Sequence, residues 1–281
     1  MFELATKDFA SVNRLLEQLQ VGVDIVGAVL SGHTKGKVFV STVADSRMAF
    51  VYDNGFCVLA GTVTDAEFAK ACLNWLYSQE ELEFFILYPG HESWVTVLDA
   101  VSAVPLRKVQ RVAFHLDADA FVAQRSRKLL PPEFVLVPMD ATVMRTVAGT
   151  LYPWAGGMWK SETRFESDGV GFCVLTDGRI VSLCYSVFVN GSHHEIDILT
   201  VERFKRLGLA KVVASAFIDK CLDRGLQPEW DCFKNNVASY QLAEVLGFRP
   251  TIEFSVYSWQ RTNGDINEAK KSLQPAALNV G

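Results

Sequence analysis

The sequence has no uninterrupted apolar run of about 18 residues, which is the length that a membrane-spanning helix needs. Its first residues do not combine a basic segment with an apolar one, as an export signal does. The 27 basic and 32 acidic side chains leave a formal charge of −5, so no excess of positive charge attracts nucleic acid or anionic lipid. We therefore expect a cytoplasmic protein without nucleic-acid or membrane partners, in which any anionic ligand is held by a local group of residues.

Metal-binding patterns are also missing. Adjacent residues of a strand point to opposite faces, so His193 and His194 do not form a ligand pair, and no third ligand is apparent. The cysteines form no C-x-x-C motif and several lie in apolar runs, which is typical of reduced core residues. They are Cys57, Cys72, Cys173, Cys184, Cys221 and Cys232. We predict no metal site.

The length of 281 residues, 49% of them hydrophobic, allows one large core or two ordinary ones. The polar stretch 123–128, followed by Pro131 and Pro132, lacks periodicity and indicates a linker. We predict an N-terminal domain over residues 1–128 and a C-terminal domain over 129–281. Both alternate helices with strands, which places the chain in the α/β (α+β) class.

The N-terminal half predicts helices and strands in alternation, with a hairpin at Asn54-Gly55, since Asn-Gly supplies the positive φ angles of a tight turn. Its other predicted elements are helices over 8–20, 64–77 and 93–101 and strands over 38–41, 83–88 and 109–115. The pentapeptide Gly-Phe-Cys-Val-Leu occurs at 55–59 and again at 171–175. Five residues are too few to establish a duplication, so a diverged copy stays an open alternative.

The C-terminal half predicts a second hairpin at Asp177-Gly178 and a well-marked helix that begins near Leu209 and stops at Gly225. The remaining elements are strands over 134–138, 230–233 and 253–259, a strand ending near Thr200, helices over 141–151 and from 238, and an irregular segment over 152–159.

Three cations stand where the helix near Leu209 begins, namely Arg203, Lys205 and Arg206. The positive end of the helix dipole disfavours each by about 0.3–1 kcal/mol, unless an anion is bound there. Gly208 lets a ligand approach the backbone, and the free amides of a first turn can hold a phosphate. The alternative is that these side chains are solvated, with Glu202 as a partial partner.

The run Lys205-Arg-Leu-Gly208-Leu-Ala210 resembles the coenzyme A signature of the GNAT acetyltransferase superfamily, which is Arg or Gln, two residues, Gly, one residue, then Gly or Ala. Trp230-Asp-Cys232 and Leu246-Gly-Phe248 follow at the distance of that superfamily's next strand and helix. The details are most similar to the zwittermicin A resistance type. The resemblance covers about the last 150 residues well and the first half only vaguely. Two positions depart from the pattern: Lys205, and Ala243 where many members have a tyrosine that protonates the leaving thiolate.

The resemblance implies a GNAT fold in the C-terminal half, with a mixed, strongly twisted sheet flanked by helices, and a degenerate GNAT-like N-terminal half. It also implies acetyl-CoA as co-substrate and no metal. By motif position, the thioester oxygen is bound by backbone amides at Leu199, Thr200 and Val201. The pyrophosphate is held by Lys205, Arg206, Leu207, Gly208, Leu209 and Ala210. Asn236 and Ser239 resemble contacts of the pantetheine arm, although both are also ordinary capping residues.

For the base that deprotonates the amine, the strand before Thr200 offers Glu195 and Asp197 on one face. We favour Glu195, which can accept a proton directly or through water. The alternative is that the two acids mark the solvent side of a half-buried strand. Without a tyrosine at 243, the leaving thiolate takes its proton from Tyr240, Ser239, Cys232 or solvent, and Tyr240 is equally suited to the core.

The acceptor site is the least defined. Tyr152, Trp154 and Trp159 could wall a pocket for a cationic amine, with Glu195, Asp197 and Asp231 strengthening its attraction, or they could be packed loop residues. We predict an N-acetyltransferase that acts on a primary amine of a small amino-containing metabolite or antibiotic-like compound. The alternatives are a silent coenzyme A sensor or scaffold and a tandem-domain aminoacyl transferase. The oligomeric state stays open, with a homodimer as one possibility.

Overall fold

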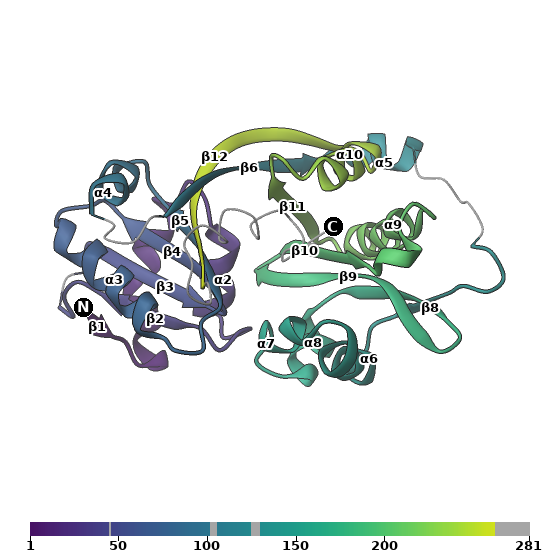
Figure 1. The fold of residues 1–281 in the computed structure, drawn as a ribbon, viewed down its shortest axis with the longest axis horizontal. Helices are drawn as coiled ribbons and strands as arrows, with labels where there is room; N and C mark the ends of the chain where they lie inside the picture. Colours follow the sequence, from purple (N-terminus) through teal and green to yellow (C-terminus); the bar gives the residue numbers. More distant parts are fainter. Residues whose placement is uncertain (45, 102–105, 125–129, 262–281) are drawn as a thin grey trace. The chain divides into compact units, whose positions relative to one another are not determined.

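The computed structural model describes residues 1–44, 46–101, 106–124 and 130–261, with the backbone alone at Thr150, Pro153 and Trp154. These residues form two compact units. Unit 1 comprises residues 1–110 and 254–261, and unit 2 comprises 111–253. Two long strands, β6 (Arg107–Leu116) and β12 (Phe248–Gln260), each pass from one unit into the other (Figure 1). The predicted boundary between residues 128 and 129 divides the sequence into two halves. In the structure, the end of β6 (from residue 111) belongs to unit 2 and the end of β12 (from residue 254) belongs to unit 1, so the two units exchange these strand ends.

The sheet of unit 1 has the strand order β1-β2-β3-β4-β5-β12. All its neighbours are antiparallel except β4 and β5, which are parallel. The hairpin between β3 and β4 is confirmed, with Asn54 at φ 44° and Gly55 at φ 87°. The strands are β1 (Phe2–Glu3), β2 (Lys37–Val40), β3 (Met48–Asp53), β4 (Phe56–Gly61) and β5 (Phe84–Pro89).

Helices cover both faces of this sheet. Two of them, α3 (Ala66–Ser78) and α4 (Ser93–Val101), share one hydrophobic core with β2 to β5, while α2 (Val23–Leu30) packs against β3 and β4. The helix predicted over 8–20 is instead a 3₁₀ helix, η1 (Thr6–Val12), followed by the single turn α1 (Asn13–Leu16). The buried residues of η1, Phe9 and Val12, lie three positions apart, which is the period of a 3₁₀ helix, and Leu15 of α1 is buried three positions further on.

The sheet of unit 2 has the order β6-β11-β10-β9-β8-β7, in which only β10 and β11 are parallel. The predicted hairpin is confirmed, with Asp177 at φ 48° and Gly178 at φ 70°. The strands are β7 (Val135–Pro138), β8 (Gly171–Thr176), β9 (Arg179–Asn190), β10 (His193–Thr200) and β11 (Gln227–Phe233).

Two sets of helices flank the sheet of unit 2. On one face α9 (Leu209–Asp223) and α10 (Val237–Val245) bury Cys184, Ile196 and Ile198 in a common core. On the other face lie α6 (Ala141–Thr146), α7 (Pro153–Gly157) and α8 (Glu162–Asp168), on the opposite side of the strands from α9 in Figure 1. The further helices are α5 (Ala118–Gln124), the π-helix η2 (Val147–Leu151) and the 3₁₀ turn η3 (Glu202–Phe204). All six cysteines, which lie in described segments, are buried and unpaired.

One order of elements recurs in both halves of the sequence: a hairpin, a helix, a strand parallel to the hairpin's second strand, another helix and a long strand. Along the first half of the sequence these are β3-β4, α3, β5, α4 and β6, and along the second half they are β9-β10, α9, β11, α10 and β12, so that the long strand at the end of each series enters the other unit. The shared pentapeptide does not follow this repeat. Its first copy consists of the turn residue Gly55 and the start of β4, whereas its second copy lies on β8, which pairs with β7 and β9 rather than with a parallel strand.

Candidate active site

The two parallel strands of unit 2 separate partway along. Residues His193–Glu195 of β10 pair with Gln227–Glu229, whereas β9 accompanies β10 to Thr200. Opposite Glu195 and Ile196, β9 carries one extra residue, Val187, and such a bulge bends a strand. Among the described strand pairs, the edge of β10 that faces β11 is therefore unpaired from Ile196 onward.

The corresponding place in unit 1 is closed. Phe56–Leu59 of β4 pair with Ile86–Pro89 of β5, and the Gly90 amide extends the ladder by donating to the Leu59 carbonyl at 3.0 Å. The helix that follows, α3, is capped by Asp65, whose carboxylate accepts from the Glu67 amide at 2.8 Å. A capping carboxylate and an acidic first turn repel an anion, so unit 1 offers no comparable site.

Backbone amides line the opening in unit 2. The Val201 amide donates to the Val181 carbonyl at 2.9 Å, so this pair belongs to the hydrogen-bonded set of the antiparallel ladder. Because such pairs alternate, the Leu199 amide also points toward β9, and those of Ile198 and Thr200 point toward the opening. Of the three residues predicted from the motif, Thr200 thus presents its amide. Ile198 was missed because the direction of an amide depends on register, which the sequence does not show.

The turn before α9 has an exposed backbone. Arg206 and Gly208 have φ angles of 63° and 84°, and Gly208 is the N-cap, without a side chain capping the helix. The first helical bond runs from the Val212 amide to the Gly208 carbonyl at 3.2 Å. A Cβ atom added at Gly208 would meet no atom within 4 Å, so the space over these amides is open. The residues present therefore fit a phosphate group at the start of α9.

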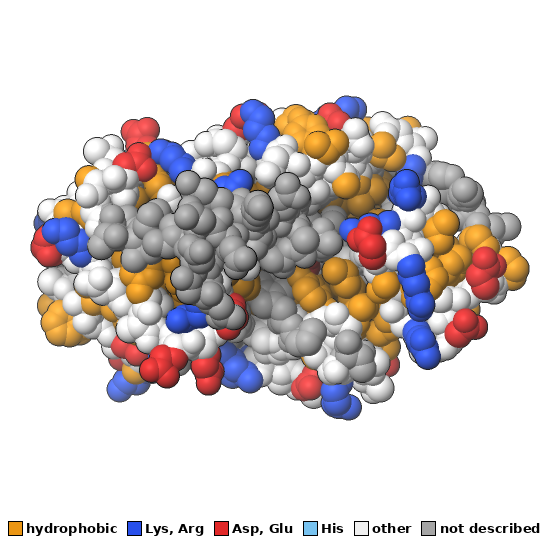
Figure 2. Space-filling view, in the orientation of Figure 1, with side chains coloured by type: hydrophobic (Ala, Val, Ile, Leu, Met, Phe, Trp, Pro, Cys, Tyr) orange, Lys and Arg blue, Asp and Glu red, His pale blue; other side chains and the backbone are white. Residues whose placement is uncertain are grey.

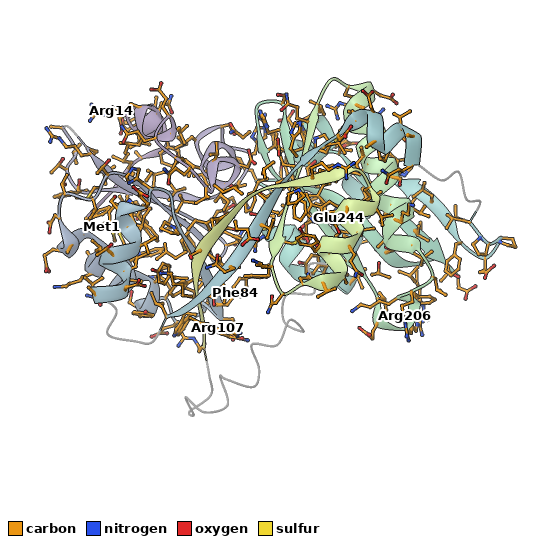
Figure 3. The ribbon with its side chains drawn as sticks, turned by 90° about the horizontal axis from the view of Figure 1, so that it is seen from above. Met1, Arg14, Phe84, Arg107, Arg206 and Glu244 are labelled. Atoms are coloured by element: carbon orange, nitrogen blue, oxygen red, sulfur yellow. The ribbon has the colours of Figure 1, made fainter. Side chains whose placement is uncertain are left out.

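The cations at this turn point in different directions. Lys205 Nζ lies 2.7 Å from Glu202 Oε2, so the partner considered from the sequence is present. The Arg203 guanidinium lies over the ring of Phe204, at 4.7 Å from its centroid. Figure 3 shows Arg206 at the outer rim of unit 2. Both side chains of the Lys205–Glu202 pair are solvent-accessible, and such a pair contributes at most about 1 kcal/mol.

The two candidate carboxylates on β10 have different surroundings. Glu195 is half-buried and is the last residue of β10 that pairs with β11, where it faces Glu229. Asp197 is only 2% exposed and lies directly opposite Tyr185 of β9. Burial raises the pKa of Asp197 to about 6, although the nearby hydroxyls of Tyr185 and Tyr152 and the backbone amide of Ile198 oppose the rise. The alternative interpretation of the sequence placed Asp197 on the solvent side of the strand. The structure shows instead that Asp197 is buried.

The raised pKa of Asp197 predicts a pH dependence of stability. The folded protein binds this proton more tightly than the unfolded chain, since the pKa is about 6 rather than 3.8. The stabilisation by the proton is complete below pH 3.8 and is lost as the pH rises through about 6. The Asp197→Asn variant has no carboxylate to titrate. The free energy of unfolding of wild type should therefore fall relative to that of the variant by up to about 3 kcal/mol between about pH 4 and pH 7. Urea unfolding across this range measures the difference, and a constant difference would contradict a poorly solvated carboxylate.

Several predicted residues near α10 have roles in the fold. Asn236 caps α10 by accepting from the Ser239 amide at 3.2 Å, and the buried Ser239 hydroxyl accepts from Trp230 Nε1 at 3.2 Å. Tyr240 packs edge-on against Phe114, with ring centroids 5.1 Å apart. Burial raises the pKa of the Cys232 thiol, which makes it a weaker acid. The capping and packing roles considered from the sequence are thus present in the structure.

Within the described residues, the structure does not contain the predicted acceptor pocket walled by Tyr152, Trp154 and Trp159. Trp159 is 2% exposed, and its Nε1 donates to the Ser186 carbonyl at 2.9 Å, so it belongs to the core. The Trp154 side chain lies outside the described residues. Asp231 pairs with Arg111 of β6, which neutralises its charge. Of the proposed aromatic residues, Tyr152 alone is found near Asp197, as its influence on the Asp197 pKa indicates.

The described residues contain no group of three or more His, Cys, Asp or Glu side chains that could hold a metal ion. The helices within the described ranges are too short or too polar to cross a membrane. On the face drawn in Figure 2, Lys and Arg side chains are interspersed with Asp and Glu. The candidate site therefore consists of backbone amides, a few cations and the carboxylates of β10.

Comparisons with known proteins agree on one family. A family model described as GNAT acetyltransferase matches residues 15–257, which include parts of both units. The uncharacterized N-acetyltransferase YdfB of Bacillus subtilis strain 168 is 28% identical over 257 residues, or 91% of this chain and 97% of that protein. A solved GCN5-related N-acetyltransferase-like protein from Streptococcus suis 89/1591 is 26% identical, with a TM-score of 0.71 over 90% of this chain and 99% of its own. A tandem GNAT protein from the clavulanic acid biosynthesis pathway shares the fold, at 13% identity and a TM-score of 0.59 over 94% and 99% of the two chains.

Proposed function

The chain belongs to the GNAT acetyltransferase family, whose enzymes take an acetyl group from acetyl-CoA, and from this premise we propose that unit 2 acetylates a primary amine by direct attack in a ternary complex. The observation that carries the proposal is the opening between β10 and β11 beside the uncapped start of α9. The first half of the sequence repeats the order of elements without either feature. The site for the acetyl donor therefore belongs to unit 2.

The pyrophosphate of the donor is assigned to the turn before α9. The amides of Arg206 to Ala210 would bind its oxygens, and Lys205 and Arg206 would supply positive charge. A doubly charged diphosphate can replace Glu202 beside Lys205, because the exposed pair is weak. The pantetheine arm then follows the unpaired edge of β10, with Asn236 and Ser239 as its predicted contacts on the α10 side.

In the proposed reaction the amine nitrogen bonds to the thioester carbonyl carbon, and the carbon–sulfur bond breaks. The carbonyl oxygen accepts a hydrogen bond from the amide of Ile198 or Thr200, which stabilises the charge that develops on it. Glu195 takes the proton from the ammonium, directly or through water. The departing thiolate is protonated by Tyr240 or by solvent, so the products are an amide and free coenzyme A.

The similarity of the motif residues to the zwittermicin A resistance type favours a small, antibiotic-like amine as acceptor. A coenzyme A sensor without turnover is the second candidate. Ala243 is buried where many relatives have a tyrosine, and Tyr240 packs on Phe114, so neither stands out as a proton donor. Release of free thiol from acetyl-CoA in the presence of an amine distinguishes the enzyme from the sensor.

Lys205→Glu should weaken coenzyme A binding by about 10-fold or more, which corresponds to roughly 1.4 kcal/mol. The change replaces a cation beside the diphosphate with an anion. Two negative side chains, residues 202 and 205, would then stand near the diphosphate and repel it. Titration calorimetry with coenzyme A measures the effect.

Lys70→Glu is the matched control for this variant. Lys70 forms the same kind of exposed i,i+3 pair, with Glu67 at 2.6 Å, but at the start of α3 in unit 1. It should bind coenzyme A as wild type does. An equal loss of coenzyme A affinity in both variants, or no loss in Lys205→Glu, would show that the turn before α9 does not bind the diphosphate.

A further inference from the structure

The fold leaves a group of buried polar atoms unsatisfied on β9 and β10. Asp197 is 2% exposed and Tyr185 is fully buried. No described residue gives the Asp197 carboxylate oxygens or the Tyr185 hydroxyl a hydrogen bond of normal length and angle, although the Tyr185 and Tyr152 hydroxyls and the Ile198 amide lie near enough to oppose the rise of the Asp197 pKa. Buried polar groups without partners are costly and rare in native proteins, and a carboxylate is the most costly kind. Such a group is explained if a ligand supplies the missing hydrogen bonds.

The position of this group is next to the proposed site of the thioester. Asp197 immediately precedes Ile198, whose amide points into the opening between β10 and β11. Ile196 and Ile198 face the core beneath α9, so the Asp197 side chain stands on the opposite face, where the Tyr185 ring contacts Phe165 of α8. A carbonyl bound in the plane of the sheet is attacked from above or below that plane. The carboxylate therefore stands on a face from which a nucleophile can approach.

Tyr152 connects this group to the surface. It is half-buried, and it joins the π-helix η2 to the short helix α7. Burial and the neighbouring Asp197 raise the pKa of its hydroxyl, so Tyr152 stays a neutral hydrogen-bonding group. π-helical turns are rare and frequently occur at functional sites.

We propose that Asp197, Tyr185 and Tyr152 form the subsite that receives the ammonium group of the acceptor. The three N–H bonds of a primary ammonium match one carboxylate and two hydroxyl oxygens. Because Asp197 and Tyr185 are buried and Tyr152 is half-exposed, the cation must enter at the tip of a slender chain. The inference rests on the proposed function and narrows the acceptor to unbranched primary alkylamines, excluding amines on ring carbons or on the α-carbon of a peptide.

The experiment measures thiol release from saturating acetyl-CoA with n-butylamine, 1,4-diaminobutane or cyclohexylamine as acceptor. The linear amines should be acetylated with a kcat/KM at least about 10-fold above that of cyclohexylamine. Tyr185→Phe should raise the KM for n-butylamine about 10-fold and Asp197→Asn about 100-fold, since hydrogen bonds to a charged group are lost. The KM for acetyl-CoA should stay unchanged in both variants.

Two controls separate binding from folding. Tyr185→Phe keeps the buried ring and removes only the hydroxyl, so its urea unfolding should stay cooperative with a midpoint close to that of wild type. Tyr257→Phe removes a similar hydroxyl from unit 1, where it donates to Asp99 Oδ1 at 2.5 Å, and it should leave both KM values unchanged.

Equal use of cyclohexylamine and n-butylamine, an unchanged amine KM in Tyr185→Phe, or no acetylation of linear amines despite normal coenzyme A binding would overturn this inference alone. Failure of the wild type to bind coenzyme A in calorimetry would overturn the proposed function and the inference with it.

Discussion

A chain that begins at residue 129 should not form a stable unit 2, although the coenzyme A motif and every candidate site residue lie within it. The missing residues include the part of β6 that pairs with β11, from Arg111 opposite Phe233 to Phe114 opposite Trp230. Val112, Phe114 and Leu116 are buried in the core of unit 2. Each contributes about 1.5–3 kcal/mol by burial, so together they approach the total stability of a typical domain.

Two further consequences add to this loss. Asp231, which is largely buried, would lose its ion pair with Arg111, and an unpaired buried charge is strongly destabilising. β11 would become an open edge strand, which promotes aggregation. We therefore expect residues 129–281 to be insoluble or to unfold without a cooperative transition.

A chain of residues 106–281 is the matched control, because it restores β6 to unit 2. Circular dichroism and urea unfolding should show a cooperative transition for 106–281 and none for 129–281. Co-expression of 1–128 with 129–281 should also restore folding, since the first fragment carries β6. A cooperative transition at the same urea concentration for both chains would contradict the exchange of strand ends.

The strand exchange shows where a single sequence stops being informative. The period of two in residues 109–115 predicts a strand, and the structure has one there, but such a pattern does not identify the strand's neighbour. Local signals were reliable where backbone chemistry alone decides the outcome. Asn54-Gly55 and Asp177-Gly178 form tight turns because these residues accept positive φ angles.

In the candidate site, too, features set by the local sequence were predicted, whereas features set by packing between distant segments were not. The apolar face that begins at Leu209 predicted a helix, which the structure confirms with α9 starting at that residue. Alternation along a strand placed Glu195 and Asp197 on one face, but it could not show that Tyr185, with Phe165 of α8 against its ring, packs on that face and that Asp197 is buried there. Likewise, Trp159 could have lined a pocket or filled the core, and the hydrogen bond to Ser186 that decides this joins residues far apart in the sequence.

Glu195→Gln should lower kcat for amine acetylation by about 10²- to 10⁴-fold, which is the usual contribution of a general base. Glutamine keeps the size and hydrogen-bonding ability of the side chain but cannot accept the proton of the ammonium. The KM for acetyl-CoA should change little, because Glu195 lies before the unpaired edge of β10 and away from the turn at Gly208. Steady-state kinetics with n-butylamine measure both parameters.

Glu229→Gln is the matched control for this variant. Glu229 faces Glu195 across the parallel pair, but its carboxylate is bonded to His193 Nδ1 at 2.7 Å. Its substitution should leave kcat within about threefold of wild type, since it removes a partly exposed pair. Similar losses in both variants would mean that the charge of this region, rather than proton transfer by Glu195, supports the reaction.

The pH profile gives the strictest test of Glu195 as the base. An alkylammonium has a pKa of about 10.4, so each unit of pH below that value reduces the free amine about tenfold. A protein base compensates for this shortage, whereas the Glu195→Gln variant must depend on amine that solvent has already deprotonated. Its kcat/KM for the amine should therefore rise about tenfold per pH unit between roughly pH 7 and pH 9, and the deficit relative to wild type should shrink. A deficit that is constant over this range would mean that Glu195 positions the substrate instead of removing its proton.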